Sequence, residues 1–270
     1  MVEQDVGRTE VRREQDGRVL RLVLDGPKTR NAIGPEVYEA VQAAVVTAGT
    51  DTSIGAIVVT GAGGFFTSGG NVRALEASAR GTLAEATVKT DRLNAMIRTI
   101  VECPKPVIAA VEGGAAGAGF SLVLACDLIV AGEGASFAAA YVRVGLSPDG
   151  GITHFLGTAL PRQLVMDMCL TGQPVAAPRL AAAGIVNACV PDGEALARAM
   201  DLATRLAAGP PRAIATIKRL VNMAGRTDLA GQMDEEARAI NLARFGAEAA
   251  EGLQAFLARR APDFNPPGKA

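Results

Sequence analysis

The chain has 270 residues, a formal net charge of -1 and 49% hydrophobic residues, which is enough for one large core or two smaller ones. The near-neutral charge and the lack of a long basic run exclude a typical nucleic-acid-binding protein. No apolar run approaches about 18 residues, so no membrane-spanning helix is expected. The charged N-terminus lacks the pattern of a signal peptide. Four cysteines without metal-ligand spacing and a single histidine favour reduced thiols, a cytoplasmic location and no metal centre.

The first elements are a hairpin, a loop, a helix and a buried strand. Residues 11–24 are predicted to form the hairpin, because Asp-Gly at their centre is a strong turn signal. Residues 25–35 are rich in proline, glycine and polar breakers and are predicted to form the loop. Pro35 suits the first turn of the helix. Residues 54–60 are fully apolar and predict a short buried strand.

A glycine-rich turn follows this strand. In residues 61–75 the backbone N–H of Gly70 is a candidate hydrogen-bond donor, and the alternative is a mobile loop. Residues 76–86 are small and polar and are interpreted as a mobile lid. The apolar spacing of residues 93–101 predicts an amphipathic helix, and Pro104 ends it.

Residues 105–127 organise the rest of the chain. An apolar run leads into four glycines separated only by alanines, and an apolar helical segment follows. This pattern predicts a strand, a tight turn and a buried helix whose first N–H groups have no intrahelical partner. The stretch lacks the Gly-Lys-Ser/Thr of a phosphate loop, and Leu122 replaces the third glycine of a dinucleotide fingerprint. Two interpretations stay open at equal weight: a backbone site for an oxyanion, and close helix–strand packing with no ligand.

Asp149 lies between a proline and a glycine in the otherwise apolar segment 135–156. A carboxylate there is poorly solvated, and this raises its pKa toward the range of a general base. The alternative is an aspartate that caps the following helix. The local sequence alone favours the cap.

The last third of the chain is predominantly helical. A short helix and an apolar run are expected in 177–190, and further helices at 194–208, 211–224, 229–243 and 247–260. The predicted division is a core of residues 1–193 and a helical C-terminal region of residues 194–270. The alanine-rich helices of this region carry narrow apolar stripes, so we expect them to pack on the core or on a neighbouring subunit.

Six segments carry a more specific pattern and span nearly the whole chain: PKTRNAI (27–33), FFTSGGNVRAL (65–75), CPKPVIAAVEGGAAGAGFSLVLACD (103–127), FAAAYVRVGLSPDGG (137–151), LTGQPVAA (170–177) and EGLQAFLARRAPDF (251–264). In order and spacing they resemble the crotonase, or enoyl-CoA hydratase/isomerase, superfamily. The motifs are most similar to those of the enoyl-CoA isomerases of the phenylacetate-degradation type.

The resemblance implies an α/β fold: a ββα spiral core that carries the coenzyme A site, and a helical C-terminal region that assembles homotrimers or homohexamers. It implies acyl-CoA thioester substrates, with coenzyme A as part of the substrate and no separate cofactor. It also implies an oxyanion hole of two backbone N–H groups, those of Gly70 and Ala118. Enolising a thioester places negative charge on its carbonyl oxygen, and two fixed donors stabilise that charge.

The resemblance also implies where the substrate lies. Backbone around Lys28, Arg30 and Ala32 is expected to hold the coenzyme A end, and either cationic side chain can pair with phosphate. The other substrate-site positions that it implies are Ser68, Gly117 and Tyr141.

Departures from the family pattern indicate the subtype. Hydratases of this family use two glutamates to position and activate water, and the matching positions here are Ser121 and Tyr141. Asp149 instead matches a third position, where members that shift double bonds place an acid. The resemblance therefore turns Asp149 from a predicted cap into the predicted base of an enoyl-CoA isomerase, with the dienolate held by Gly70 and Ala118.

Two other functions stay open. One is an enoyl-CoA hydratase of the fatty-acid β-oxidation type, and the other is a catalytically silent acyl-CoA-binding paralogue or assembly subunit. The number of carboxylates at positions 121, 141 and 149 distinguishes them. Two glutamates indicate a hydratase, one aspartate indicates an isomerase, and none would indicate binding only.

Overall fold

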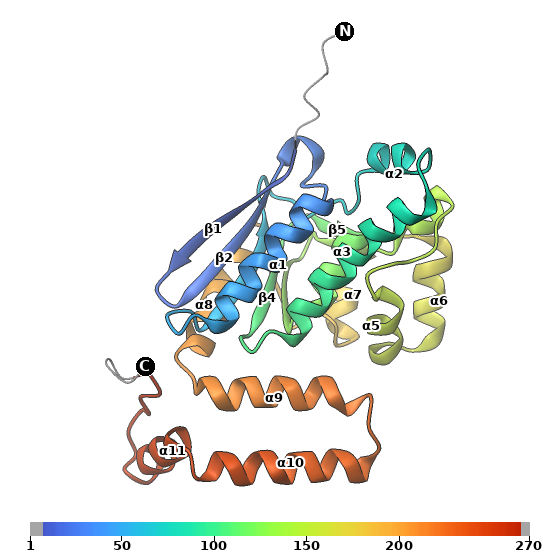
Figure 1. Ribbon diagram of the computed structural model, residues 1–270. Helices are drawn as coiled ribbons and strands as arrows, with labels where there is room; N and C mark the ends of the chain where they lie inside the picture. The colour runs from blue at the N-terminus through green and yellow to red at the C-terminus, as the bar shows by residue number, and fades with distance from the viewer. Residues whose placement is uncertain (1–7, 266–270) are drawn as a thin grey trace.

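The computed structural model describes residues 8–265, which form a layered α/β core with a group of helices extending below it (Figure 1). The strands are β1 (Glu10–Asp16), β2 (Val19–Asp25), β3 (Ala56–Gly61), β4 (Val107–Val111), β5 (Gly114–Ala116), β6 (Leu128–Gly132), β7 (Ser136–Ala138), β8 (Val175–Ala176) and β9 (Ala188–Val190). The α-helices are α1 (Pro35–Thr50), α2 (Val72–Ser78), α3 (Leu83–Glu102), α4 (Ala118–Ala125), α5 (Ile152–Ala159), α6 (Arg162–Thr171), α7 (Ala177–Ala182), α8 (Ala195–Ala207), α9 (Pro211–Ala224), α10 (Leu229–Arg244) and α11 (Ala247–Leu257). Two 3₁₀ helices are η1 (Pro27–Thr29) and η2 (Ala140–Val144).

The larger sheet has the order β1-β2-β3-β4-β6-β9. The predicted hairpin is confirmed: β1 and β2 pair antiparallel, and Gly17 in their turn has φ 55°. The other strands run parallel. Strands β3 and β4 are almost wholly buried. Their continuous apolar sequences are typical of parallel strands that are covered on both faces. Helices α1 and α3 cover one face and α8 covers the other (Figure 1).

Alanines allow α8 to approach the sheet closely. Its buried positions recur every four residues: Ala195, Ala199, Ala203 and Ala207. A methyl group at Gly55 would lie only 2.7 Å from the Cα of Ala207, so small side chains are needed on both sides of this contact. The division at residue 193 stays a prediction. Helix α8, which it assigns to the C-terminal region, packs on the sheet, whereas α9, α10 and α11 extend beyond it (Figure 1).

A second sheet, of order β5-β7-β8, gives the core its spiral form. After β4 the chain adds β5 and then α4, and after β6 it adds β7 and then η2. After β3, Thr67 forms an isolated bridge to Ala115 of β5 before α2 begins. Each turn of the chain thus contributes a strand to the large sheet, a short strand or bridge to the small one, and a helix. The predicted α/β ββα spiral core is therefore confirmed.

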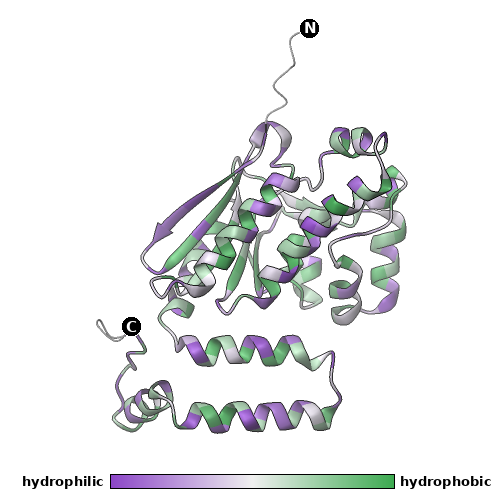
Figure 2. Ribbon diagram, viewed as in Figure 1, coloured by the Kyte–Doolittle hydropathy of each residue, from purple (hydrophilic) through white to green (hydrophobic). Residues whose placement is uncertain are grey.

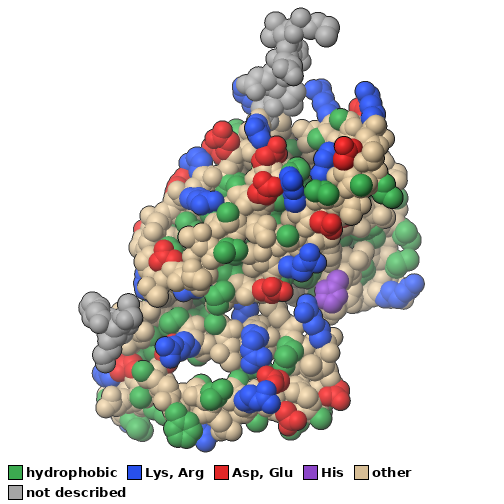
Figure 3. Space-filling view, viewed as in Figure 1, with side chains coloured by type: hydrophobic (Ala, Val, Ile, Leu, Met, Phe, Trp, Pro, Cys, Tyr) green, Lys and Arg blue, Asp and Glu red, His purple; other side chains and the backbone are tan. Residues whose placement is uncertain are grey.

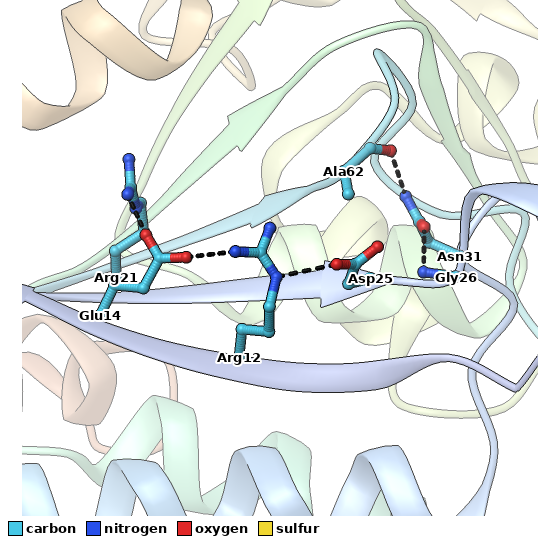
Figure 4. A network of polar contacts seen from close by, with 7 residues as sticks. All are labelled: Arg12, Glu14, Arg21, Asp25, Gly26, Asn31 and Ala62. Carbon is cyan, nitrogen blue, oxygen red and sulfur yellow. Dashed lines mark hydrogen bonds and ion pairs between the residues drawn. The ribbon is translucent and has the colours of Figure 1, made fainter.

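The loop 25–35 is fixed by the fully buried side chain of Asn31 (Figure 4). Its Oδ1 accepts a hydrogen bond of 2.8 Å from the backbone N–H of Gly26. Its Nδ2 donates to the carbonyl oxygens of Ala62 and Phe65, at 2.8 and 2.6 Å. Asn31 has φ 53°, a conformation that asparagine tolerates better than most residues. One side chain thus ties the first loop to the glycine-rich turn after β3.

We expect Asn31→Ala to lower the free energy of unfolding by roughly 2–4 kcal/mol, because it leaves buried backbone groups without partners and places alanine at a positive φ. Urea denaturation measures the change. Asn241→Ala is the matched control, since Asn241 is exposed on α10, and we expect a change within about 0.5 kcal/mol. Equal effects of the two substitutions would contradict this role for Asn31.

Helix α9 is attached to the core through Lys218. Its Nζ donates to Asp127 Oδ2 at 2.7 Å and to the carbonyl oxygen of Ile100 at 2.9 Å. Beyond this contact, Figure 2 shows hydrophobic and hydrophilic residues alternating along α9 and α10, and Figure 3 shows hydrophobic side chains on the surface of the C-terminal helices. Over residues 8–265, no helix has both the length and the apolar character to cross a bilayer.

Candidate active site

The two glycine-rich turns predicted from the sequence lie against each other. The Thr67–Ala115 bridge joins them. A methyl group at Gly69 would overlap the carbonyl oxygen of Ala116 and would lie 3.5 Å from the nitrogen of Ala118. A methyl group at Gly119 would overlap Thr67. The turns approach this closely only because both positions are glycine.

This contact brings two backbone donors to one place. Ala118 is the first residue of α4 and follows Gly117, which has φ 52°, so its N–H has no intrahelical acceptor. Gly70 lies on the adjacent turn, where the N–H of Ile33 donates to Gly69 O at 2.8 Å. Within residues 8–265, neither the Gly70 N–H nor the Ala118 N–H donates to a protein acceptor in the hydrogen bonds found. Two free donors, one of them at the start of a helix, can hold an oxyanion.

Asp149 lies beside these turns and contacts two hydroxyl groups. Tyr141 Oη donates to Asp149 Oδ1 at 2.9 Å. Ser121 Oγ donates to the backbone carbonyl of Asp149 at 3.1 Å and lies 3.3 Å from Tyr141 Oη. The ring of Tyr141 also reaches the first turn of α4, because a methyl group at Gly117 would lie 3.9 Å from its Cζ. Tyr141 therefore spans the distance between the backbone donors and the carboxylate.

The local expectation that Asp149 caps the next helix is wrong. The N-cap of α5 is Gly151, and no side-chain hydrogen bond caps that end. Burial raises the pKa of the Asp149 carboxyl, and the hydrogen bond from Tyr141 counteracts part of this rise. A half-buried carboxyl that has a raised pKa and accepts a hydrogen bond from one hydroxyl group has the character of a general base.

Tyr38 is a further residue near Asp149, and none of the sequence motifs includes it. It is buried on α1, and burial, followed by the charge of Asp149, raises the pKa of its phenol. The same two causes, in the same order, raise the pKa of the Tyr141 phenol. The two tyrosines of the chain therefore both lie near Asp149 and stay protonated near neutral pH. A buried tyrosine on an otherwise aliphatic helical face is the only hint that the sequence offered.

The predicted coenzyme A residues form a separate group on the loop before α1. Lys28 and Arg30 are exposed, and the Arg30 guanidinium lies 5.5 Å above the Phe65 ring. Ala32 and Ser68 are half-buried. Ser68 joins this loop to the turn that carries Gly70. Its N–H donates to Arg30 O at 2.9 Å, and its hydroxyl donates to the carbonyl of residue 29 at 3.1 Å. The exposed cations thus lie on the loop that is bonded to the Gly70 turn.

A cavity of about 550 Å³ lies elsewhere, between the C-terminal end of α3 and helix α9. Its lining includes Val101, Cys103, Lys218 and Met223 and none of the predicted site residues. The contacts around Asp149 do not involve this cavity.

Comparisons with known proteins agree on one family. Residues 14–267 match the enoyl-CoA hydratase/isomerase family model. The chain is 34% identical to 2,3-dehydroadipyl-CoA hydratase of Escherichia coli, over 92% of this chain and 95% of the relative. It is 32% identical to 1,2-epoxyphenylacetyl-CoA isomerase of the same organism, over 91% and 94%.

A crystal structure of an enoyl-CoA hydratase from Polaromonas sp. JS666 superposes with a TM-score of 0.92 at 40% identity, covering 94% of this chain and 98% of that one. Relatives with hydratase names outnumber those with isomerase names. The fold, the family model and the identities lead to the same result: the chain belongs to the enoyl-CoA hydratase/isomerase family, the crotonase superfamily.

Proposed function

We propose that this protein is an enoyl-CoA isomerase that shifts a double bond through a dienolate. Asp149 removes a proton from the carbon α to the thioester and returns it at the γ carbon, or performs the reverse transfer. The N–H groups of Gly70 and Ala118 hold the thioester oxygen while it carries negative charge. The reaction is a proton transfer, so it requires no redox group, and coenzyme A enters as part of the substrate.

One observation carries the proposal: among positions 121, 141 and 149, only Asp149 is a carboxylate. Tyr141 contacts its carboxylate and Ser121 contacts its backbone carbonyl. Ser121 and Tyr141 lie within hydrogen-bonding distance of Asp149. A single carboxyl of raised pKa can take a proton and return it near neutral pH. Hydratases of this family activate a water molecule with two carboxylates. Here these positions hold no second carboxylate.

The substrate end is proposed to follow the exposed loop. Lys28 and Arg30 lie in solvent on the loop that Ser68 joins to the Gly70 turn. We propose that this loop, with the backbone at Ala32, holds the coenzyme A moiety and that either cation pairs with its phosphates. Ser68, Gly117 and Tyr141 would then line the passage to the reacting carbons.

A panel of 2-enoyl-, 3-enoyl- and ring-1,2-epoxide-CoA thioesters tests the proposal by mass spectrometry and ultraviolet absorbance of the products. We expect at least one thioester to change absorbance without a change in mass. Gain of one water by every substrate that reacts would contradict the proposal. Binding without any conversion would instead indicate a catalytically silent acyl-CoA-binding protein.

Hydration is the second candidate, and the names of the relatives favour it. Several enzymes more than 30% identical to this chain are called hydratases. The side chains at 121 and 141 argue against it here, since serine and tyrosine are poor bases near neutral pH. The same mass measurement decides between the two activities.

We also propose that the protein assembles as a homotrimer or homohexamer through its C-terminal helices. Large apolar side chains on α9, α10 and α11, and at the residue that follows α10, are more than half exposed in the single chain: Ile217, Val221, Leu229, Met233, Ile240, Leu242, Phe245, Leu253, Phe256 and Leu257. Apolar surface on this scale is typical of a subunit interface.

Light scattering at micromolar concentration is expected to give a mass of three or six chains. Phe245→Glu, at a side chain that is 91% exposed, should shift the protein toward smaller species while circular dichroism stays unchanged. A stable monomer of the parent protein at this concentration would contradict the assembly.

A further inference from the structure

The two oxygens of the Asp149 carboxylate have different surroundings. Oδ1 accepts the 2.9 Å hydrogen bond from Tyr141. Within residues 8–265, Oδ2 takes part in none of the hydrogen bonds found. Tyr141 is thus the neighbouring side chain that holds the carboxylate, at Oδ1, and the other group that stabilises its charge is the backbone N–H of Asp149 itself.

The hydroxyl protons around this carboxylate can be assigned. Tyr141 has one proton and two acceptors within reach, Asp149 Oδ1 at 2.9 Å and the Asp149 carbonyl at 3.4 Å. The shorter bond to a charged acceptor is the stronger one. Ser121 then gives its own proton to the Asp149 carbonyl at 3.1 Å. When Asp149 is neutral, a proton on Oδ1 would force Tyr141 to give up its 2.9 Å bond and donate to the Asp149 carbonyl at 3.4 Å instead. The arrangement that keeps the shorter bond has the carboxyl proton on Oδ2.

Close packing around Gly150 holds the backbone next to Asp149 in place. Ser121 is fully buried on α4. A methyl group at Gly150 would lie 2.8 Å from the Cβ of Ser121 and 3.4 Å from Cδ2 of Leu93 on α3. Gly150 has φ 61°, so glycine is needed both for the backbone conformation and for the close contact. The backbone that carries Asp149 is therefore held against α3 and α4.

We propose that Tyr141 is a positioning residue that holds Asp149 Oδ1 and leaves Oδ2 as the one oxygen that exchanges a proton with the substrate. The inference rests on the isomerase function proposed above. The C–H bond at the α or γ carbon breaks as the O–H bond at Oδ2 forms, and the electron pair moves into the dienolate. The reverse step at the other carbon returns the same proton from the same oxygen. Both carbons must therefore come within reach of Oδ2.

Within residues 8–265, the titratable groups that face Asp149 are the two tyrosines, Tyr141 from η2 and Tyr38 from α1. Helices α3 and α4 present Leu93 and Ser121 to the segment, and neither titrates. None of the ion pairs found within residues 8–265 includes Asp149. The Tyr141 hydroxyl is thus the one side-chain donor there that stabilises the charged carboxylate.

Tyr141→Phe tests the inference through the pH dependence of kcat/KM. A base acts when it is deprotonated, so activity is present above the pKa of Asp149 and is lost as the pH falls through it. Removing the Tyr141 donor raises the pKa of Asp149 further above its usual range. We expect the acidic limb of the profile to move to higher pH, so that activity on the limb falls about tenfold while the alkaline plateau is reduced much less.

Tyr38→Phe is the matched control. It also removes a tyrosine hydroxyl near Asp149, but the Tyr38 hydroxyl forms no hydrogen bond to the carboxylate. Its acidic limb should stay at the pH of the parent. A Tyr141→Phe enzyme whose activity falls equally at every pH, with its limb unmoved, would show that Tyr141 is only a packing residue and would overturn the inference.

Two further measurements complete the test: the first does not depend on activity, and the second does not depend on the Tyr141→Phe variant. Carbon-13 NMR of labelled aspartate carboxyls, assigned by loss of a signal in Asp149→Asn, follows the Asp149 titration directly. Its midpoint should rise in Tyr141→Phe even if the protein proves not to be an isomerase, and an unchanged midpoint would overturn the inference. In Tyr38→Phe protein grown on fluorotyrosine, only position 141 is fluorinated, and the more acidic phenol should lower the midpoint. A midpoint that stays the same or rises would count against the inference.

Discussion

Asp149→Asn is expected to lower the rate of double-bond isomerisation by about 10² to 10⁴, the usual worth of a positioned general base. The amide keeps the shape of the side chain but cannot take a proton. Burial holds the carboxyl in a poorly solvated place, so water does not readily replace it as the base. Binding of acyl-CoA should persist, because the loop with Lys28 and Arg30 is unchanged. Steady-state kinetics and calorimetric binding with the same thioester measure the two effects.

Asp167→Asn is the control for this experiment. Asp167 is exposed on α6, so the same chemical change there should leave the rate within about twofold. If the Asp149→Asn enzyme isomerises its substrate within a few-fold of the parent, Asp149 is not the base. The dienolate mechanism proposed through this residue would then be wrong, although the isomerase activity itself would stand.

Ala118→Pro is expected to lower the rate by about 10² to 10³, since it removes one of two oxyanion donors. Ala118 is the first residue of α4, where proline suits the helical backbone and the N–H has no intrahelical role. The preceding residue is Gly117, the least restricted neighbour for a proline. The proline ring also enters the space where the thioester oxygen would lie. Rate measurement with circular dichroism separates loss of the donor from loss of fold.

Ala118→Gly is the matched control, because it changes the side chain and keeps the N–H. Its rate should stay far closer to that of the parent than the rate of Ala118→Pro. A folded Ala118→Pro enzyme with normal turnover would refute the oxyanion assignment at this residue. Equal losses in both variants would place the effect in the side chain and not in the hydrogen bond.

Much of the fold follows from local patterns. The Asp16-Gly17 turn, Pro35 at the start of α1 and the apolar run of β3 each specify their elements through short-range physics, and the structure confirms them. Both glycine-rich stretches follow buried strands as predicted, but the tight turn expected after β4 is in part the strand β5 (Gly114–Ala116). Their contact was not predictable from either stretch alone, because it depends on the pairing of Thr67 with Ala115 across the fold.

Other features depend on tertiary contacts that a local pattern does not contain. Strand β5 consists of glycine and alanine, which have little tendency to form strands, and it exists because β7 pairs with it. Helix α8 reads as one more alanine-rich tail helix, yet it covers a face of the sheet. The cap assigned to Asp149 failed because the chain turns at Gly150 and Gly151, both at positive φ, and places the carboxyl against Tyr141 instead.

The most direct test of the central claim is the mass of the product formed from a 3-enoyl-CoA thioester in heavy water. Shift of the double bond by Asp149 predicts a product that carries at most the deuterium exchanged through the carboxyl, with no added oxygen, and Asp149→Asn should form it far more slowly. A 3-enoyl-CoA thioester left unchanged by the parent protein, or converted equally fast by Asp149→Asn, would contradict the account.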